Sequence, residues 1–394
     1  MNSITPDPGP LPPLSGMLRL IETGIAERQH LGAQVYVSLR GRVAADLALG
    51  EAQPGVALEP SSLMMWLSAC KPVAAVAVGQ LWEQGLLDVD DPVARHVPEF
   101  ANNGKERITL RHVLTHMGGF RAAAANWSGR PWEEIIATIC ASRPEPRWPL
   151  GWKAGYDAAA GWFMLGEVVR RVSGVPFCRY ARERIFEPLG MADSWIGIPP
   201  DRIAQYGSRI APMFDTRGSH PTAQTFAGNQ PEQISACLPG ANGRGPAREL
   251  GRFYEMLLGR GTLDGVRLLA PPTVDALTSR HRAGMFDHSF QHEVDWGLGF
   301  LINSAHYGAG TVPYGYGPHA RPRAFGHSGN QSSVAFADPE IGLVAVVLLN
   351  GMPGEARHQA RMRALLAALY EDLGLVPGEG AVAAARRSRE AAPA

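Results

Sequence analysis

Patterns typical of β-strands lie near both ends of this chain, and patterns typical of helices fill the middle. Val35, Val37 and Leu39 alternate with other residues and lead into Arg40-Gly41, which predicts a hairpin turn. Near the other end, SSVAFA and LVAVVLLN flank residues 338–342, and this spacing predicts a second antiparallel hairpin. Because both hairpins have an apolar face to bury, we expect one antiparallel sheet built from both ends, flanked by helices and interrupted by an inserted helical region.

Glycines and prolines divide the rest of the chain into helices. The spacing of apolar residues predicts helices over residues 17–29 and 355–373, and over PVAAVAVGQLWEQGLL, LRHVLTHMGG and GWFMLGEVVRRVSG. We therefore expect one domain of mixed α and β structure. Its predicted boundaries are residues 15–375, with a sheet part over 15–67 and 235–375 and a helical part over 68–234. Residues 1–14 are predicted to be a flexible leader and residues 376–394 a disordered tail.

Composition limits the partners and the location. The 394 residues carry a formal net charge of zero, which argues against a nucleic-acid partner. No apolar run approaches the ~20 residues of a membrane span, and the first residues lack the features of a signal peptide. We expect a cytoplasmic protein that acts on a small molecule, and the oligomeric state stays open. The four cysteines show no metal-site spacing, so we expect free, reduced thiols and no zinc.

The first candidate for chemistry is the segment 68–71, Ser-Ala-Cys-Lys, at the predicted start of a helix. Ser68 and Lys71 are three residues apart and share one helix face. Burial lowers the pKa of a lysine, so that its neutral amine can take the serine proton, and a helix N-terminus offers an N–H to an oxyanion. The pattern alone also arises by chance. However, only three of the 37 basic residues are lysines, and this one lies within the apolar stretch WLSACKPVAAVAV.

Two later segments supply further candidates. Tyr156 ends the Gly-containing loop WKAGY before a predicted helix, where its hydroxyl can relay a proton or simply anchor a packed ring. His327 lies in GHSGN, just before the first late strand as we predict it. It is a candidate for orienting the substrate, or else a solvated histidine in a turn. Gly329 and the N–H of Asn330 are candidates for an oxyanion or substrate site, because small residues allow close approach of the backbone.

In this order, the three segments resemble the SxxK, tyrosine and K/H-[ST]-G motifs of the serine β-lactamase and penicillin-binding-protein superfamily. The likeness extends to LRHVLTHMGGF, to GWFMLGEVVRRVSGVPFCRYARERIFEPLGMADS and to GHSGNQSSVAFADPEIGLVAVVLLN, and so covers about residues 15–375. The resemblance implies an α/β part and a helical part with the serine at their junction. It implies Ser68 as nucleophile, Lys71 as base, Tyr156 as a partner in proton transfer, and the N–H groups of Ser68 and Asn330 as the oxyanion hole.

The sequence departs from the β-lactamase pattern at three places. His327 stands where β-lactamases have a lysine, as in the esterase-like members of the superfamily. Tyr156-Asp157-Ala158 lacks the amide side chain that would contact an acylamino group, and Cys70 replaces the more usual threonine. These changes leave acyl transfer possible but argue against β-lactam and D-Ala-D-Ala substrates.

Several other residues have a functional and a structural interpretation. His112 and His116 have the spacing of a metal pair on one helix, but no third ligand is evident, so we expect no metal. His281, His288 and His292 cluster in a polar loop, which we expect to be a solvated or cleft-lining loop rather than a site of its own. No GxSxG sequence is present, which excludes the α/β-hydrolase nucleophile elbow. Five tryptophans could form an acyl pocket or pack in the core: Trp66, Trp127, Trp148, Trp152 and Trp296.

Together these residues predict an enzyme, a serine hydrolase of the carboxylesterase type. It would cleave esters through an acyl-enzyme on Ser68, with Lys71 and Tyr156 as a general-base pair and without cofactor or metal. The same acyl-enzyme could serve an acyltransferase, or an amide-forming or amide-cleaving enzyme of a biosynthetic pathway, if water were excluded. A catalytically silent binding protein is a third hypothesis, against which the joint presence of Ser68, Lys71 and Tyr156 argues.

Overall fold

A seven-stranded antiparallel sheet forms one half of the protein, in a computed structural model that describes residues 11–124, 127, 129–223 and 226–376. The strand order is β12-β13-β14-β15-β1-β2-β3. These strands are β1 (Gly32–Leu39), β2 (Arg42–Gln53), β3 (Val56–Ala57), β12 (Leu301–Ile302), β13 (Phe325–Gly329), β14 (Ser333–Asp338) and β15 (Leu343–Leu349). β1 pairs with β15, so that Val35 lies opposite Val347. The sheet built from both ends of the chain is therefore confirmed.

The remaining elements are helices and short strands. The helices are α1 (Ser15–Ala26), α2 (Lys71–Glu83), α3 (Val93–His96), α4 (Leu110–Leu114), α5 (Trp132–Ala141), α6 (Ala160–Ser173), α7 (Phe177–Ala181), α8 (Pro200–Tyr206), α9 (Pro231–Ser235), α10 (Ala247–Leu258), α11 (Pro271–Thr278) and α12 (Glu355–Asp372). The short strands are β4 (Met64–Leu67), β5 (Trp195–Ile196), β6 (Phe214–Asp215), β7 (Gly243–Gly245), β8 (Thr262–Leu263), β9 (Val266–Arg267), β10 (Phe286–Asp287), β11 (His292–Glu293) and β16 (Gly351–Met352).

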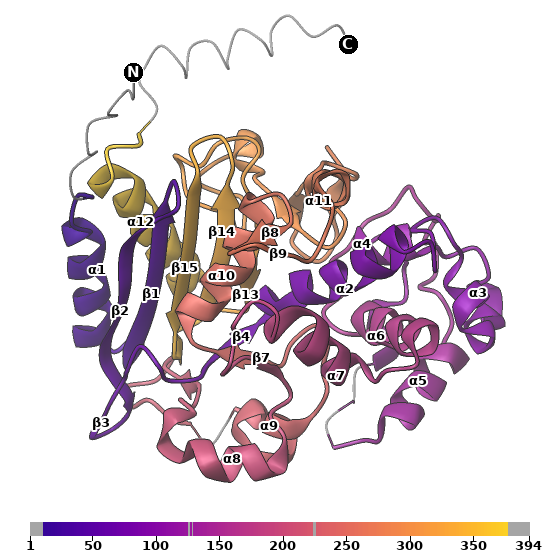
Figure 1. The fold of residues 1–394 in the computed structure, drawn as a ribbon, viewed down its shortest axis with the longest axis horizontal. Helices are drawn as coiled ribbons and strands as arrows, with labels where there is room; N and C mark the ends of the chain where they lie inside the picture. Colours follow the sequence, from indigo (N-terminus) through magenta and orange to yellow (C-terminus); the bar gives the residue numbers. More distant parts are fainter. Residues whose placement is uncertain (1–10, 125–126, 128, 224–225, 377–394) are drawn as a thin grey trace, which may run out of the picture.

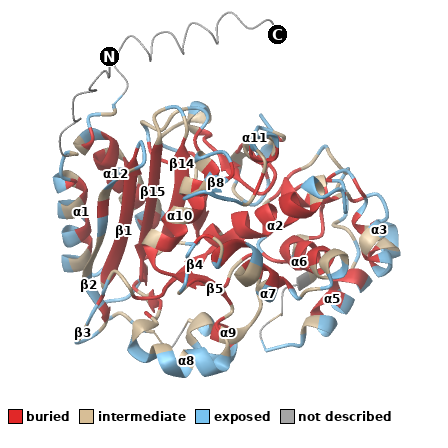
Figure 2. Ribbon diagram, viewed as in Figure 1, coloured by how far each residue is buried: buried red, intermediate tan, exposed pale blue. Residues whose placement is uncertain are grey.

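Helices cover both faces of the sheet. Because successive strand residues point to opposite faces, Val35 joins an apolar core with Met17 of α1 and Leu365 of α12. Tyr36 points the other way and packs in a second core with Leu250 of α10. Figure 1 shows α1 and α12 on one side of the sheet and α10 on the other, and Figure 2 shows the strands buried between them.

The helix α2 joins the sheet part to the helical part. Residues 71–81 of this helix are all buried, between the sheet and the group of helices α3–α7 (Figure 2). A helix that is apolar on all sides needs such surroundings, which explains the run of Val and Ala after Lys71. The predicted arrangement of an antiparallel sheet, flanking helices and an inserted helical region is confirmed.

Some local expectations differ from the structure. The helix expected over LRHVLTHMGG ends at Leu114, because His116 has a φ of 59°, in the left-handed region. The GHSGN segment lies largely within β13 rather than before a strand. Leu14 is only 3% exposed and packs in the core, although we expected residues 1–14 to be loose. Residues 1–10 of that leader and 377–394 of the expected tail lie outside the described residues.

Two of the four cysteines form a disulfide, between Cys178 of α7 and Cys237. The expectation of four reduced thiols is therefore wrong for this pair, which the fold brings together across 59 positions of sequence. Cys70 and Cys140 are free and buried, as expected. Among the described residues, none of the helices is both long and apolar enough to cross a bilayer.

Candidate active site

Ser68 lies at a sharp bend between a strand and a helix. It opens the 3₁₀ turn Ser68–Cys70, which continues directly into α2. The preceding residue, Leu67, ends β4 with φ 50° and ψ −134°, a conformation that is strained for any residue except glycine. Strain of this kind persists only where the surrounding structure holds it, and here the bend leaves Ser68 partly exposed in a cavity of about 430 Å³.

Lys71 lies one helical turn further on, fully buried. Its Nζ is 3.2 Å from Ser68 Oγ, 2.9 Å from the carbonyl oxygen of Ala158 and 2.6 Å from that of Gly240. Burial lowers the pKa of Lys71 to about 8. A neutral amine has two N–H groups and one lone pair. The two carbonyls can accept both N–H groups, which leaves the lone pair directed at the Ser68 hydroxyl.

Tyr156 contacts the other side of the serine. Its hydroxyl donates to Ser68 Oγ at 2.8 Å, and burial raises the pKa of this phenol well above its usual value. The backbone N–H of Tyr156 donates to Asp287 Oδ1 at 3.0 Å. The next N–H in the chain, that of Asp157, donates to His116 Nδ1 at 2.9 Å, and Asp157 in turn accepts from the first turn of α6. Asp287 and His116 therefore fix the backbone at Tyr156 and Asp157, while burial keeps the Tyr156 phenol protonated.

His327 is a neutral residue in this structure. Burial lowers its pKa to about 3, and Nδ1 is 2.8 Å from the carbonyl oxygen of Ser328. Because a carbonyl only accepts, Nδ1 carries the proton and Nε2 is an acceptor, buried without a partner. His327 lines the cavity beside Tyr156, with ring centroids 6.0 Å apart. It can orient a donor group of a substrate, but it supplies no positive charge.

Gly329 and Asn330 lie at the end of β13. A Cβ on Gly329 would come within 2.5 Å of the Trp66 carbonyl oxygen, so only glycine allows β13 to pass so close to β4. Asn330 is exposed at the rim of the cavity, with its side chain 3.2 Å from the Tyr314 hydroxyl oxygen. The structure thus brings together all six predicted site residues, Ser68, Lys71, Tyr156, His327, Gly329 and Asn330.

Several groups of the site were missed in the sequence. The carbonyls of Ala158 and Gly240 are backbone atoms with no signature of their own. Phe290 and Tyr314 form an aromatic wall of the cavity, and both lie in segments without a regular apolar pattern. Glu355, another lining residue, is the first residue of α12.

The histidine-containing loop over residues 281–292 lines the cleft, one of the two interpretations that the sequence left open. Arg282 and Asp287 form a fully buried ion pair at 2.9 Å, and Arg282 also donates to the Thr115 carbonyl at 2.9 Å. Asp287 receives the N–H of Tyr156 and of Phe290, so the loop positions the cavity wall. Of the five tryptophans considered above, Trp296 lines the cavity, whereas Trp152 is 84% exposed.

A metal site at His112 and His116 has no support within the described part of the chain. No group of three or more potential ligands occurs there, and His116 Nδ1 accepts the N–H of Asp157, 41 positions further along the chain. His112 Nδ1 accepts the N–H of Thr109 at the start of α4.

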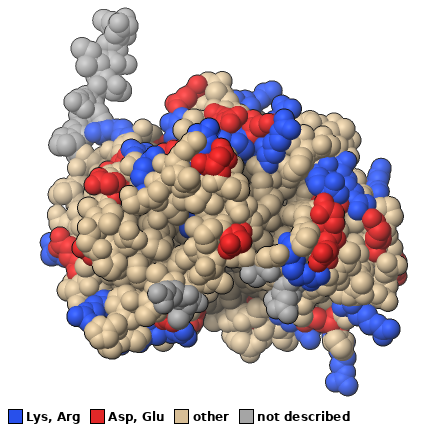
Figure 3. Space-filling model, turned by 90° about the horizontal axis from the view of Figure 1, so that it is seen from below, with Lys and Arg blue, Asp and Glu red and all other residues tan. Residues whose placement is uncertain are grey.

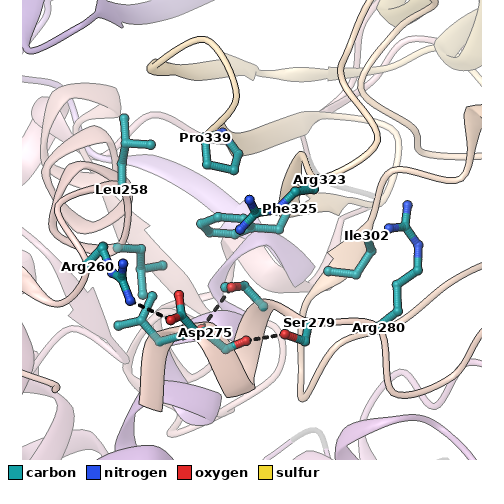
Figure 4. A pocket seen from close by; sticks show the side chains of 12 residues that line it. Leu258, Arg260, Asp275, Ser279, Arg280, Ile302, Arg323, Phe325 and Pro339 are labelled. Atoms are coloured by element: carbon teal, nitrogen blue, oxygen red, sulfur yellow. Dashed lines mark hydrogen bonds and ion pairs between the residues drawn. The ribbon is translucent and has the colours of Figure 1, made fainter. Parts of the chain in front are cut away.

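A second cavity of about 430 Å³ lies away from the serine, between α10, α11 and the β12–β13 edge of the sheet (Figure 4). Two of its arginines are already paired: Arg260 with Asp275 at 2.6 Å, and Arg280 with Asp295 at 2.7 Å. It contains none of the predicted site residues. The face of the molecule in Figure 3 carries basic and acidic side chains interspersed with one another.

Comparison with known proteins agrees with the geometry. The family model described as Beta-lactamase matches residues 17–369. The chain is similar to the Esterase/beta-lactamase LipL of Mycobacterium tuberculosis, with 26% identity over 86% of this chain and 81% of LipL. It is also similar to the Esterase EstB of Burkholderia gladioli, with 26% identity over 85% of this chain and 91% of EstB.

Solved structures give the same result. A family VIII carboxylesterase is 27% identical with a TM-score of 0.75, covering 92% of this chain and 99% of that chain. A penicillin-binding protein homologue from Caulobacter crescentus is 29% identical with a TM-score of 0.72, covering 91% and 99%. Since the family model spans most of its length and esterases are among its relatives, this chain belongs to the β-lactamase family of serine hydrolases.

Proposed function

We propose that this protein cleaves carboxylic esters through an acyl-enzyme on Ser68. The observation that carries the proposal is the contact of three groups: Lys71 Nζ lies 3.2 Å and Tyr156 OH 2.8 Å from Ser68 Oγ. Packing alone does not require a buried lysine next to a serine and a tyrosine. The similarity to esterases and the absence of a lysine at position 327 favour an ester over a β-lactam as substrate.

The reaction would proceed in two stages. Ser68 Oγ attacks the ester carbonyl carbon while its proton moves to the neutral amine of Lys71. The ester C–O bond then breaks, and the departing alcohol oxygen receives the proton of Tyr156. The protonated Lys71 gives its extra proton to Tyr156, so that both groups return to their starting states. Water attacks the resulting acyl-enzyme with the same groups acting in reverse, so that the carboxylic acid leaves and Ser68 is restored.

The negatively charged oxygen of each tetrahedral intermediate needs hydrogen-bond donors. We propose that the backbone N–H groups of Ser68 and Asn330 donate to it, and that Gly329 allows the backbone to approach closely. Ser68 lies at the start of the turn that leads into α2, where free N–H groups and the helix dipole favour negative charge. Donors of this kind typically contribute about 3–4 kcal/mol each to the transition state.

Intact-protein mass spectrometry with p-nitrophenyl butyrate tests the proposal. The wild type should form a butyryl adduct on Ser68 and release p-nitrophenolate. Ser68→Ala should form no adduct and lose turnover by at least ~10³-fold with an unchanged unfolding midpoint. Wild-type turnover in Ser68→Ala would overturn the assignment. Adding an alcohol and measuring its butyrate ester distinguishes hydrolysis from acyl transfer.

The expected location and partners stay predictions. A small acyl compound fits a cavity of about 430 Å³. The predicted cytoplasmic location depends partly on reduced thiols, whereas the Cys178–Cys237 disulfide is more typical of an oxidising compartment.

A further inference from the structure

The rim of the catalytic cavity carries a carboxylate. Glu355 lines the cavity as the first residue of α12 and is exposed to solvent. Its Oε2 accepts from the Tyr314 hydroxyl at 2.8 Å, and its Oε1 accepts from Gln359 Nε2 at 2.8 Å. Gln359 Oε1 also receives the N–H of Tyr314 at 3.1 Å. The carboxylate is thus held in one orientation by two side chains.

A series of contacts between aromatic rings leads from the serine to this carboxylate. Tyr156, which donates to Ser68, stacks on Phe290 with ring centroids 4.8 Å apart. Phe290 contacts Tyr314 at 5.8 Å, and Tyr314 donates to Glu355. Aromatic faces carry negative electrostatic potential and attract cations, and a carboxylate beside them adds its own negative charge. A group bound between these rings and Glu355 would lie in the same cavity as the ester.

Lys71, fully buried, contacts the Ser68 hydroxyl at 3.2 Å, so the positive charge that belongs to this cavity lies at the serine and not beside Glu355. Among the described residues that line the cavity, none is a lysine or arginine, and His327 is neutral because its Nδ1–H donates to a carbonyl. In the ion pairs of the described residues, Glu355 has no basic partner. The part of the cavity around Glu355 therefore favours cations and repels anions.

We propose that Glu355, together with Phe290 and Tyr314, selects substrates that carry a positively charged amine or quaternary ammonium group. This inference rests on the proposed ester hydrolysis at Ser68 and names its substrate class. Anionic acyl compounds are excluded by the same carboxylate, which acts on binding and not on proton transfer.

Isosteric ester pairs test the charge preference in the wild type. One pair places the charge in the acyl part: p-nitrophenyl 4-(trimethylammonio)butyrate and p-nitrophenyl 5,5-dimethylhexanoate, in which carbon replaces nitrogen. The other places it in the alcohol part: butyrylcholine and 3,3-dimethylbutyl butyrate. We expect kcat/KM to favour the cation in at least one pair by about tenfold, or about 1.4 kcal/mol. A preference below about twofold in both pairs would overturn the proposal.

A variant then assigns the preference to its residue. Glu355→Gln keeps an acceptor for Tyr314 and removes the charge, so the cation-to-neutral ratio should fall to near one, mainly through KM. Glu133→Gln is the matched control, because Glu133 is also an exposed acid in the first turn of a helix, α5, and should leave the ratio unchanged. An unchanged ratio in Glu355→Gln would mean that another group selects the charge.

The proposed function has a separate readout in the same experiment. Turnover of the neutral isosteres that is lost in Ser68→Ala establishes the hydrolase whatever the charge preference. Failure of the charge proposal and failure of the hydrolase proposal are therefore distinguishable.

Discussion

Lys71 is buried among oxygen acceptors, and none of its hydrogen-bond partners is a carboxylate. Burial therefore lowers its pKa to about 8 from about 10.5, and the neutral, basic form becomes more abundant as pH rises through 8. If Lys71 is the base, kcat/KM for an uncharged ester should be low at pH 6 and rise to a plateau above an apparent pKa near 8. This value belongs to the coupled Lys71–Tyr156 pair. A flat profile from pH 6 to 9 would argue against an amine base.

Substitution of Lys71 tests whether this residue acts as a base or only supplies positive charge. Lys71→Arg keeps the charge, but a guanidinium stays protonated at any working pH. We expect this variant to lose kcat by on the order of 10²–10⁴, as much as Lys71→Ala, because general-base catalysis is lost in both. Steady-state kinetics with p-nitrophenyl butyrate measure kcat of both variants and of the wild type. Near-normal rates in Lys71→Arg would move the role of base to Tyr156 or His327.

Charge at the cavity also predicts poor β-lactam hydrolysis. Nitrocefin carries a carboxylate, whereas His327 is neutral and Glu355 is negative at the rim. Ala158 offers no amide side chain to an acylamino group. We expect kcat/KM for nitrocefin to be at least about 100-fold below that for p-nitrophenyl butyrate. Comparable values would contradict a neutral His327 and a negative Glu355 in the cavity.

At the scale of helices and strands, the sequence predicted those elements that have a regular spacing of apolar residues. Both hairpins, α2 and α6 follow apolar spacing, and the three motifs located Ser68, Tyr156 and His327. The patterns could not predict the Gly240 carbonyl, since a backbone atom acts there, nor the end of α4 before His116. The wall formed by Phe290 and Tyr314 depends on the tertiary contacts of irregular loops.

The close contact of β13 with β4 gives a test at this scale. Gly329→Ala would place a Cβ within 2.5 Å of the Trp66 carbonyl oxygen and 2.2 Å of Ser333 Oγ. We expect a stability loss of about 1–3 kcal/mol from overpacking, and a fall in kcat/KM of ~10²-fold because displacement of β13 moves the site. Denaturant unfolding and ester kinetics measure the two effects.

A matched control exists for this substitution. Gly310→Ala should change neither quantity, because its Cβ would meet no atom within 4 Å. Equal behaviour of the two variants would show that β13 has room to adjust.

At the scale of the whole molecule, the site depends on segments far apart in the chain. Ser68 and Lys71 come from the junction of β4 and α2, Tyr156 from the loop before α6, and His327 from the sheet. The Gly240 carbonyl that holds Lys71 lies between α9 and β7. One covalent bond ties this segment to the helical part, since Cys237 lies three positions before Gly240 and is bonded to Cys178 of α7.

Removing this bond should affect stability and catalysis together. Cys178→Ser combined with Cys237→Ser should lower the free energy of unfolding by about 2–4 kcal/mol, the usual contribution of a disulfide. It should also lower kcat by about tenfold, less than the ~10² of a 1 Å displacement, because the Gly240 carbonyl is held less firmly against Lys71. Dithiothreitol should produce the same changes in the wild type and none in the double variant, since the remaining cysteines, Cys70 and Cys140, are free thiols already. If the double variant is less stable but keeps its full kcat, the disulfide supports only the fold, and other contacts place Gly240 against Lys71.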